Sequence, residues 1–264
     1  MKEKWRLLLH PQMSGDWHMA ADVTLAQQIG RHLAPATFRA FSWSPATISV
    51  GHNQRQDALD LHACRSDGLR VVRRPTGGRA ILHCDEITYS AIFPVTSRLY
   101  APQLLANYLK ISKILKAALE PFGLLFDPNF GDGTQTGSED SELCFARALS
   151  YELTIGGKKL VGSAQRRWAT VVLQHGSILL GPCHEKLGAY LKAPESEREA
   201  HMQLLRQRTT FVKRYLPQSI SLEEFARSVQ KSFEIAGEVC LEPGSLTPDE
   251  EQAIRELAPT FRIL

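Results

Sequence analysis

A chain of 264 residues, 43% hydrophobic and 22% charged, predicts one large globular domain or one domain with a small appendage. Its net charge of +3 and pI of about 8.6 are too mild to indicate nucleic-acid binding, although they would suit an acidic protein partner. No run of about 18 apolar residues predicts a transmembrane helix, and the N-terminal apolar stretch is too short for a signal peptide. We therefore expect no membrane association.

Five cysteines are scattered along the chain, at positions 64, 84, 144, 183 and 240, without a CxxC pair. Their odd number and spacing argue against a disulfide framework or a zinc site, and for a reducing cytoplasm. We expect Cys64, Cys183 and Cys240 to be small buried apolar residues and Cys84 to be incidental, because most free cysteines have no chemical role.

The first part of the chain alternates between strand and helix patterns. Residues 5–9 and 37–51 have the composition of strands, and residues 16–29 between them have a helical pattern that ends near Gly30. A short helical pattern at 57–65 leads to the segment that dominates the functional interpretation.

That segment, residues 71–83, has apolar runs on both sides of Pro75-Thr76-Gly77-Gly78 and therefore predicts a strand, a tight loop and a strand. Two adjacent glycines permit positive φ and the close approach of another molecule. Arg73, Arg74 and Arg79 bracket the loop and His83 follows it. The alternative is a β-hairpin with a basic tip, because short motifs often occur by chance.

The middle of the chain continues the mixed pattern. Residues 87–94 alternate like a strand, and residues 100–122 predict the clearest helix, because apolar residues recur there at spacings of three and four. Residues 127–142 are acidic and glycine-rich, which predicts a loop and a candidate active-site lid. A hairpin at 151–163 with a Gly-Gly turn and a strand at 171–180 follow. After Pro182 the pattern predicts helices at 185–191, 195–215, 221–236 and 248–258.

The segment from Arg73 to Ala80, with His83 and Thr88-Tyr89-Ser90, resembles the signature of the lipoate–protein ligase and octanoyltransferase superfamily, which shares its fold with biotin–protein ligases. A second block, residues 157–167 followed by 175–180, is similar to the lysine strand of that superfamily and its partner. Two blocks in this order, roughly 80 residues apart, are more specific than either alone.

The resemblance covers about residues 1–182 and implies an α/β (α+β) fold, with a mixed, largely antiparallel sheet flanked by helices. We expect residues 1–182 to form the catalytic core. Residues 183–264 are expected to be a helical C-terminal segment packed on the same domain.

Cys144, at the end of the predicted loop, and Lys159, on the next strand but one, are residue types that could together transfer an acyl group. A thiol accepts an acyl group as the thiolate, which a nearby ammonium favours. The thioester can then pass the acyl group to an amine, while the ammonium stabilises the oxyanion. Strand alternation allows only one of Lys158 and Lys159 to point inward, and we expect Lys159 to do so. The alternative for Cys144 is a small buried side chain.

The Cys-Phe pair at 144–145 and the strands after it are similar to the cysteine-dependent octanoyltransferases, which use a Cys/Lys dyad. The resemblance implies that Cys144 and Lys159 are catalytic. It also implies a pocket for an acyl chain and its carboxyl or adenylate end. The implied substrate-binding residues are Arg74, Gly77, Gly78, Arg79, His83, Tyr89, Gly162 and Ser163. For His83, a purely structural role is the alternative to proton transfer.

Three functions remain open at this point. The first is transfer of octanoyl from the phosphopantetheine of acyl carrier protein, through a Cys144 thioester, to a lysine of a lipoyl domain or of the glycine cleavage H protein. This function needs no metal, ATP or other cofactor. The second is an ATP-dependent lipoate–protein ligase, in which the arginine–glycine loop would hold phosphate, or the related octanoyl amidotransferase that acts between lipoyl domains. The third is a silent acyl-binding protein on the same scaffold.

Overall fold

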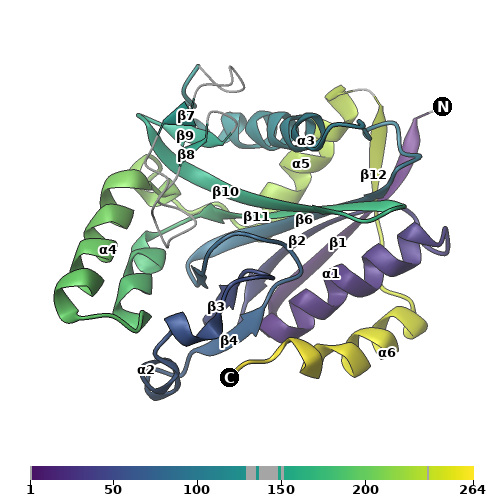
Figure 1. Cartoon of the computed structure of the whole chain (residues 1–264). Helices are drawn as coiled ribbons and strands as arrows, with labels where there is room; N and C mark the ends of the chain where they lie inside the picture. The colour runs from purple at the N-terminus through teal and green to yellow at the C-terminus, as the bar shows by residue number, and fades with distance from the viewer. Residues whose placement is uncertain (1, 129–134, 137–147, 150–151, 237) are drawn as a thin grey trace.

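The computed structural model describes residues 2–128, 135–136, 148–149, 152–236 and 238–264, and its central feature is a seven-stranded sheet (Figure 1). The strand order is β12-β1-β2-β6-β11-β10-β9. The strands are β1 (Glu3–Met13), β2 (Thr37–Trp43), β6 (Glu86–Pro94), β9 (Leu153–Ile155), β10 (Lys158–Arg167), β11 (Val171–Leu179) and β12 (Val239–Pro243). Strand β1 is parallel to both β2 and β12, and the other pairs are antiparallel. The predicted mixed, largely antiparallel sheet is confirmed.

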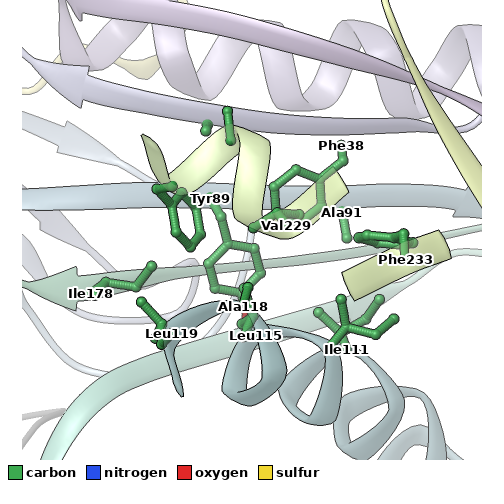
Figure 2. Close-up of a cluster of buried hydrophobic side chains, with 14 of the residues drawn as sticks. Phe38, Tyr89, Ala91, Ile111, Leu115, Ala118, Leu119, Ile178, Val229 and Phe233 are labelled. Atoms are coloured by element: carbon green, nitrogen blue, oxygen red, sulfur yellow. The ribbon is translucent and has the colours of Figure 1, made fainter. Parts of the chain in front are cut away.

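Helices cover both faces of this sheet. Figure 1 shows α3 (Leu104–Leu119) and α5 (Leu222–Ala236) on one face and α1 (Gly15–Gly30) and α6 (Pro248–Leu257) on the other. The face under α3 and α5 is apolar because alternate residues of the strands point to it. Figure 2 shows Phe38 and Tyr89 of the sheet clustered with Leu115 of α3 and Phe233 of α5, all buried. Burial of each such side chain contributes about 1.5–3 kcal/mol, so this face holds the main core.

The opposite face of the sheet is polar at its centre, and a small second sheet lies over that region. The small sheet has the order β4-β3-β5 and consists of β3 (Thr47–Val50), β4 (Arg70–Arg73) and β5 (Ile81–His83). Short helices η1 (Gln56–Ala58) and α2 (Leu61–Ser66) connect β3 to β4. Buried polar residues of the large sheet, including Thr88, His175 and Ser177, face this second sheet. The functional site is therefore expected between the two sheets.

The C-terminal part of the chain differs in two ways from the predicted run of helices. The segment η4 (Pro182–Tyr190) is a 3-10 helix, followed by α4 (Glu195–Arg208) and η5 (Val212–Arg214), with η6 (Ala258–Phe261) near the end. Between α5 and α6, strand β12 pairs with β1 at the sheet edge, and this strand was not predicted from the sequence. Its alternation of Val239 and Leu241 is too short to separate from the end of a helix without its partner strand.

The expectation of unpaired, incidental cysteines is wrong for Cys84 and Cys183, which form a disulfide across a sequence separation of 99 residues. The pairing depends on the tertiary contact between the end of β5 and the start of η4, which spacing along the chain does not reveal. Cys64 is buried, as expected, and Cys240 is partly buried. Because two of the five cysteines are paired, the cysteines of this chain no longer indicate a reducing compartment.

The short strands β7 (Gln135–Thr136) and β8 (Ala148–Leu149) pair with each other, and η2 (Glu120–Phe122) follows α3. Most of the predicted loop at 127–142, and Cys144, lie outside the described residues. Among the helices that the structure describes, none has both the length and the apolar character needed to cross a bilayer. The residues that the structure describes include no group of three or more His, Cys, Asp or Glu side chains that could hold a metal ion.

Candidate active site

A cavity lies between the two sheets, with about 440 Å³ of space including its mouth. The enclosed part of that space is about 30 Å³, which is roughly the room that one or two water molecules need. Part of its wall is apolar, formed by Met19, Trp43, Ile81 and Ala164. Five of the residues predicted to bind substrate or act on it also line the cavity: Arg74, His83, Lys159, Gly162 and Ser163.

The other predicted site residues that the structure describes lie outside this cavity. Gly77, Gly78 and Arg79 line a second, more open hollow, with about 1030 Å³ of space including its mouth, together with residues 53–55, 57 and 58. Tyr89 points to the opposite face of the large sheet, where its ring stacks on Phe38. Gly77, Gly78, Arg79 and Tyr89 therefore do not line the cavity.

Tyr89 nevertheless supports the cavity wall from behind. Its hydroxyl hydrogen-bonds Ser163 Oγ at 2.7 Å and accepts a bond from Gln174 Nε2 at 3.0 Å. Burial raises the pKa of Tyr89 to about 12, so the phenol keeps its proton. Gly176 lies beside this pair, and a Cβ there would come within 2.6 Å of Ser163 Oγ. Glycine is therefore required at position 176.

The arginines of the glycine loop hold the loop itself. Arg74 donates from Nη2 to the carbonyl oxygens of Gly77 at 2.8 Å and Arg79 at 2.6 Å. Arg73 donates to carbonyl oxygens of the segment after β3, including that of Gly51 at 3.0 Å. A Cβ on Gly51 would lie 1.9 Å from the carbonyl oxygen of Gly78. The loop folds tightly onto β3, and these guanidinium groups satisfy carbonyl groups that would otherwise lack partners.

Lys159 reaches the cavity because strand β10 contains a bulge. Lys159 pairs with Thr154 and Val161 with Leu153, so two residues of β10 are opposite one residue of β9. The extra residue reverses the alternation of side chains. Lys159 consequently lines the cavity with Gly162 and Ala164, whereas Val161 packs in the main core. Lys159 is 1% exposed.

The ammonium group of Lys159 forms an ion pair with Glu152, at 2.7 Å between Nζ and Oε2. Both side chains are buried. By contrast, Lys158 is partly exposed and donates to the carbonyl oxygen of Arg206. Loss of one partner of a buried ion pair costs about 3–5 kcal/mol, so Glu152 determines where the ammonium group lies.

A second polar group joins the two sheets at His83. Its Nδ1 bonds Glu86 Oε1 at 2.8 Å and its Nε2 bonds Ser49 Oγ at 2.7 Å. Trp43 stacks on the imidazole at 4.0 Å between ring centroids and 11° between planes. Thr88 Oγ1 donates to the same carboxylate oxygen at 2.5 Å, and Ser177 Oγ donates to it at 2.7 Å. The ring of His83 is fixed in position and orientation.

A buried charged network lies beside the cavity under α1. Asp22 forms an ion pair with Arg39, and its second oxygen bonds His175 Nδ1 at 2.9 Å. Burial would raise the pKa of Asp22, but the charge of Arg39 and the bond to His175 outweigh it and lower that pKa. Burial lowers the pKa of His175, which keeps this imidazole neutral. Its Nε2 bonds Thr76 Oγ1 at 2.6 Å, so the network also anchors the glycine loop.

The supporting residues of the site were not predicted from the sequence. Asp22, Arg39 and Glu86 had no assigned role, although Asp22 and Arg39 are polar residues within predicted elements and Glu86 stands just before the predicted strand at 87–94. Glu152 lies in the first strand of the predicted hairpin, and the Gly-Gly turn fixes which residues of that hairpin face each other. An acidic partner for the lysine was therefore open to prediction from the hairpin register.

The chain has the same fold as solved lipoate protein ligases. A bipartite lipoate protein ligase from Thermoplasma acidophilum superposes with a TM-score of 0.77 at 21% identity, covering 97% of this chain and 92% of that chain. A lipoate-protein ligase A bound with ATP has a TM-score of 0.74 at 20% identity, with coverage of 98% and 95%. At these identities, the similarity shows the fold.

The family follows from the sequence. The profile of the lipoyl protein ligase A/B catalytic domain matches residues 15–234, and the chain belongs to this family. Octanoyltransferase LipM of Moorella thermoacetica is 35% identical over 98% of this chain and 96% of its own length. Octanoyltransferase LipM of Clostridioides difficile is 32% identical, with the same two coverages. The expected superfamily is confirmed.

Proposed function

We propose that this chain is an octanoyltransferase of protein lipoylation that moves octanoyl from acyl carrier protein, through a Cys144 thioester, to a lysine of a lipoyl domain. The observation that carries the proposal is similarity over nearly the whole chain to proteins named octanoyltransferase. The buried cation of Lys159 on the wall of a partly apolar cavity agrees with this activity, because a fatty acyl chain needs an apolar wall.

The chemistry takes two steps. The thiolate of Cys144 attacks the acyl carbonyl, a new carbon–sulfur bond forms, and the phosphopantetheine thiolate leaves. The neutral ε-amine of the acceptor lysine then attacks the Cys144 thioester, an amide forms, the cysteine thiolate leaves and the amine nitrogen loses one proton. The ammonium group of Lys159 stabilises the thiolate and the oxyanion of each tetrahedral intermediate.

Glu152 has a defined part in this scheme. Its carboxylate holds Nζ of Lys159 at 2.7 Å, so the cation is in place before substrate arrives. A group that is already oriented does not need to reorganise in the transition state. We assign Glu152 as the positioning residue of Lys159.

The donor and acceptor are both carried on proteins. The net charge of +3 favours encounter with acidic partners, as we propose for acyl carrier protein and for a lipoyl domain or glycine cleavage H protein. Neither half-reaction requires ATP or a metal ion, because the donor is already a thioester.

The alternative is an ATP-dependent lipoate–protein ligase. The observation that favours it is the open hollow beside Gly77, Gly78 and Arg79, in a fold shared with a ligase that was solved with ATP. Backbone N–H groups and an arginine at that place could hold phosphate.

One experiment separates these functions. The protein is incubated with octanoyl-acyl carrier protein without ATP, and its intact mass is measured. We expect an octanoyl adduct that is lost in Cys144→Ala and kept in the matched control Cys240→Ala. Subsequent addition of a lipoyl domain should move the adduct to that domain.

Other outcomes contradict the proposal. Modification of the lipoyl domain only with octanoic acid and ATP would identify a ligase. Transfer only from an octanoylated H protein would identify an amidotransferase. An absence of transfer under all three conditions would identify a silent acyl-binding protein.

A further inference from the structure

We propose that Ser49 is a second acyl-accepting nucleophile in the cavity and that it hydrolyses medium-chain acyl esters and thioesters without Cys144. The motivating observation is the chain of hydrogen bonds from Ser49 through His83 to Glu86. The inference rests on the proposed function only in that an acyl chain enters this cavity.

The hydrogen bonds that join Ser49, His83 and Glu86 have a fixed direction. Arg74 Nη1 lies 3.1 Å from Ser49 Oγ and can only donate, because guanidinium has no acceptor. At the other end, a carboxylate can only accept, so Nδ1 of His83 is the donor to Glu86 in the tautomer that fits this bond. Nε2 is then an acceptor, and the hydroxyl proton of Ser49 points to it at 2.7 Å.

This order of hydroxyl, imidazole and carboxylate is the arrangement that activates serine in hydrolases on unrelated folds. Glu86 fixes the ring tautomer, and Trp43 fixes the ring plane by stacking on it. Arg74 places a positive charge next to the oxygen that becomes more negative as its proton leaves. Ser49, His83 and Glu86 are all buried, so a molecule must enter the cavity to reach Ser49.

The chemistry of the cavity lining, rather than its present volume, suits an acyl group. Ser49 and His83 line it together with Met19, Trp43 and Ile81. Lys159 lines the same cavity, and its ammonium group can stabilise a developing oxyanion. An apolar wall, a nucleophile with its base, and a nearby cation are the parts that acyl transfer to serine requires.

The proposed reaction uses only ester and water. Ser49 Oγ bonds to the acyl carbon as its proton moves to Nε2 of His83. The bond from that carbon to the leaving oxygen or sulfur breaks, and the leaving group takes the proton. Water then attacks the acyl-serine, giving its proton to Nε2. The bond between carbon and Oγ breaks, Ser49 recovers the proton, and the free acid is released.

A second arrangement in the same molecule provides a matched control. Thr76, His175 and Asp22 form a similar chain of hydroxyl, imidazole and carboxylate. Thr76 does not line the cavity, and Asp22 is also paired with Arg39. Thr76→Val therefore removes a buried hydroxyl bonded to an imidazole without removing the proposed nucleophile.

The test uses the full chain carrying Cys144→Ala, with p-nitrophenyl octanoate as substrate. We expect hydrolysis that falls about 100-fold or more on adding Ser49→Ala, and that changes less than about twofold on adding Thr76→Val. An alkyl fluorophosphonate should label the Cys144→Ala protein on the peptide that contains Ser49. Thermal unfolding confirms that each variant folds.

Three results would overturn the inference: hydrolysis unchanged by Ser49→Ala, labelling on another residue, or neither hydrolysis nor labelling in the folded Cys144→Ala protein. Formation of the Cys144 adduct from octanoyl-acyl carrier protein in the folded Ser49→Ala variant would support the proposed function. A failure of Ser49 to hydrolyse esters would then contradict this inference alone. If Ser49 were labelled in a protein that forms no Cys144 adduct from octanoyl-acyl carrier protein, this inference would be supported and the proposed function contradicted.

Discussion

The ion pair between Lys159 and Glu152 allows the structural and catalytic roles of the lysine to be measured separately. Both side chains are buried, at 1% and 7% exposure. Lys159→Met removes the ammonium group that compensates the buried carboxylate, and breaking a buried pair from one side costs about 3–5 kcal/mol. We expect octanoyl transfer to fall by about 100-fold or more, because an oxyanion loses a donor of fixed position.

A second substitution should restore stability but not activity. Addition of Glu152→Gln to Lys159→Met removes the uncompensated charge, and we expect the free energy of unfolding to recover to within about 2 kcal/mol of the parent. Urea unfolding followed by tryptophan fluorescence measures this, with an unchanged m value as the check on two-state unfolding. Transfer should remain at the level of the single variant, because the cation is still absent.

The neighbouring lysine is the matched control. Lys158→Met removes a partly exposed ammonium group and should change the free energy of unfolding by less than about 0.5 kcal/mol. The reasoning would be refuted if Lys159→Met cost no more than Lys158→Met, or if the double variant were as unstable as Lys159→Met alone.

Three further predictions concern the scaffold. Burial lowers the pKa of His184 to about 4, so the unfolded chain takes up this proton first as pH falls below 6.5. The contribution of the neutral His184 to the unfolding free energy is complete above pH 6.5 and is lost between pH 6.5 and about pH 4. His184→Asn should therefore reduce the pH slope of the unfolding free energy in that range by up to about 1.4 kcal/mol per pH unit. An unchanged slope would contradict this. Gly51→Ala places a Cβ 1.9 Å from the facing loop carbonyl and should cost about 1–3 kcal/mol or more by urea unfolding, whereas Gly77→Ala, with open space around it, should cost less than about 0.5 kcal/mol. Reduction of the disulfide between Cys84 and Cys183 should lower the unfolding free energy by about 2–5 kcal/mol, a change that is absent when both are replaced by alanine.

Elements with long or strongly alternating patterns were predicted well. The helical pattern of residues 16–29 became α1, that of 221–236 became α5, and the alternating strand at 87–94 became β6. The Gly156-Gly157 turn was predictable because both residues have positive φ, 59° and 72°, which glycine adopts without strain. In each case the local sequence and the tertiary structure favour the same conformation.

The candidate site was predicted in part. Lys159 and His83 belong to motifs whose residue types indicate chemistry, and both line the cavity. Tyr89 belongs to the same motif, but its parity on β6 directs it to the opposite face of the sheet. Knowing which face of β6 lines the site would have required the positions of the strands on either side.

The motifs of the sequence by themselves indicated the family, and the resemblance implied the mixed sheet. Apolar periodicity and glycine positions predicted many of the helices and strands and the loop that borders the site, because they act locally. Only the tertiary structure decided that a bulge turns Lys159 into the cavity beside Glu152 and that Ser49, His83 and Glu86 meet in one chain of hydrogen bonds. It also decided the disulfide between Cys84 and Cys183. Each of these contacts joins strands or loops whose relative register follows from packing of the whole domain, and a shift of one residue reverses the face to which a side chain points.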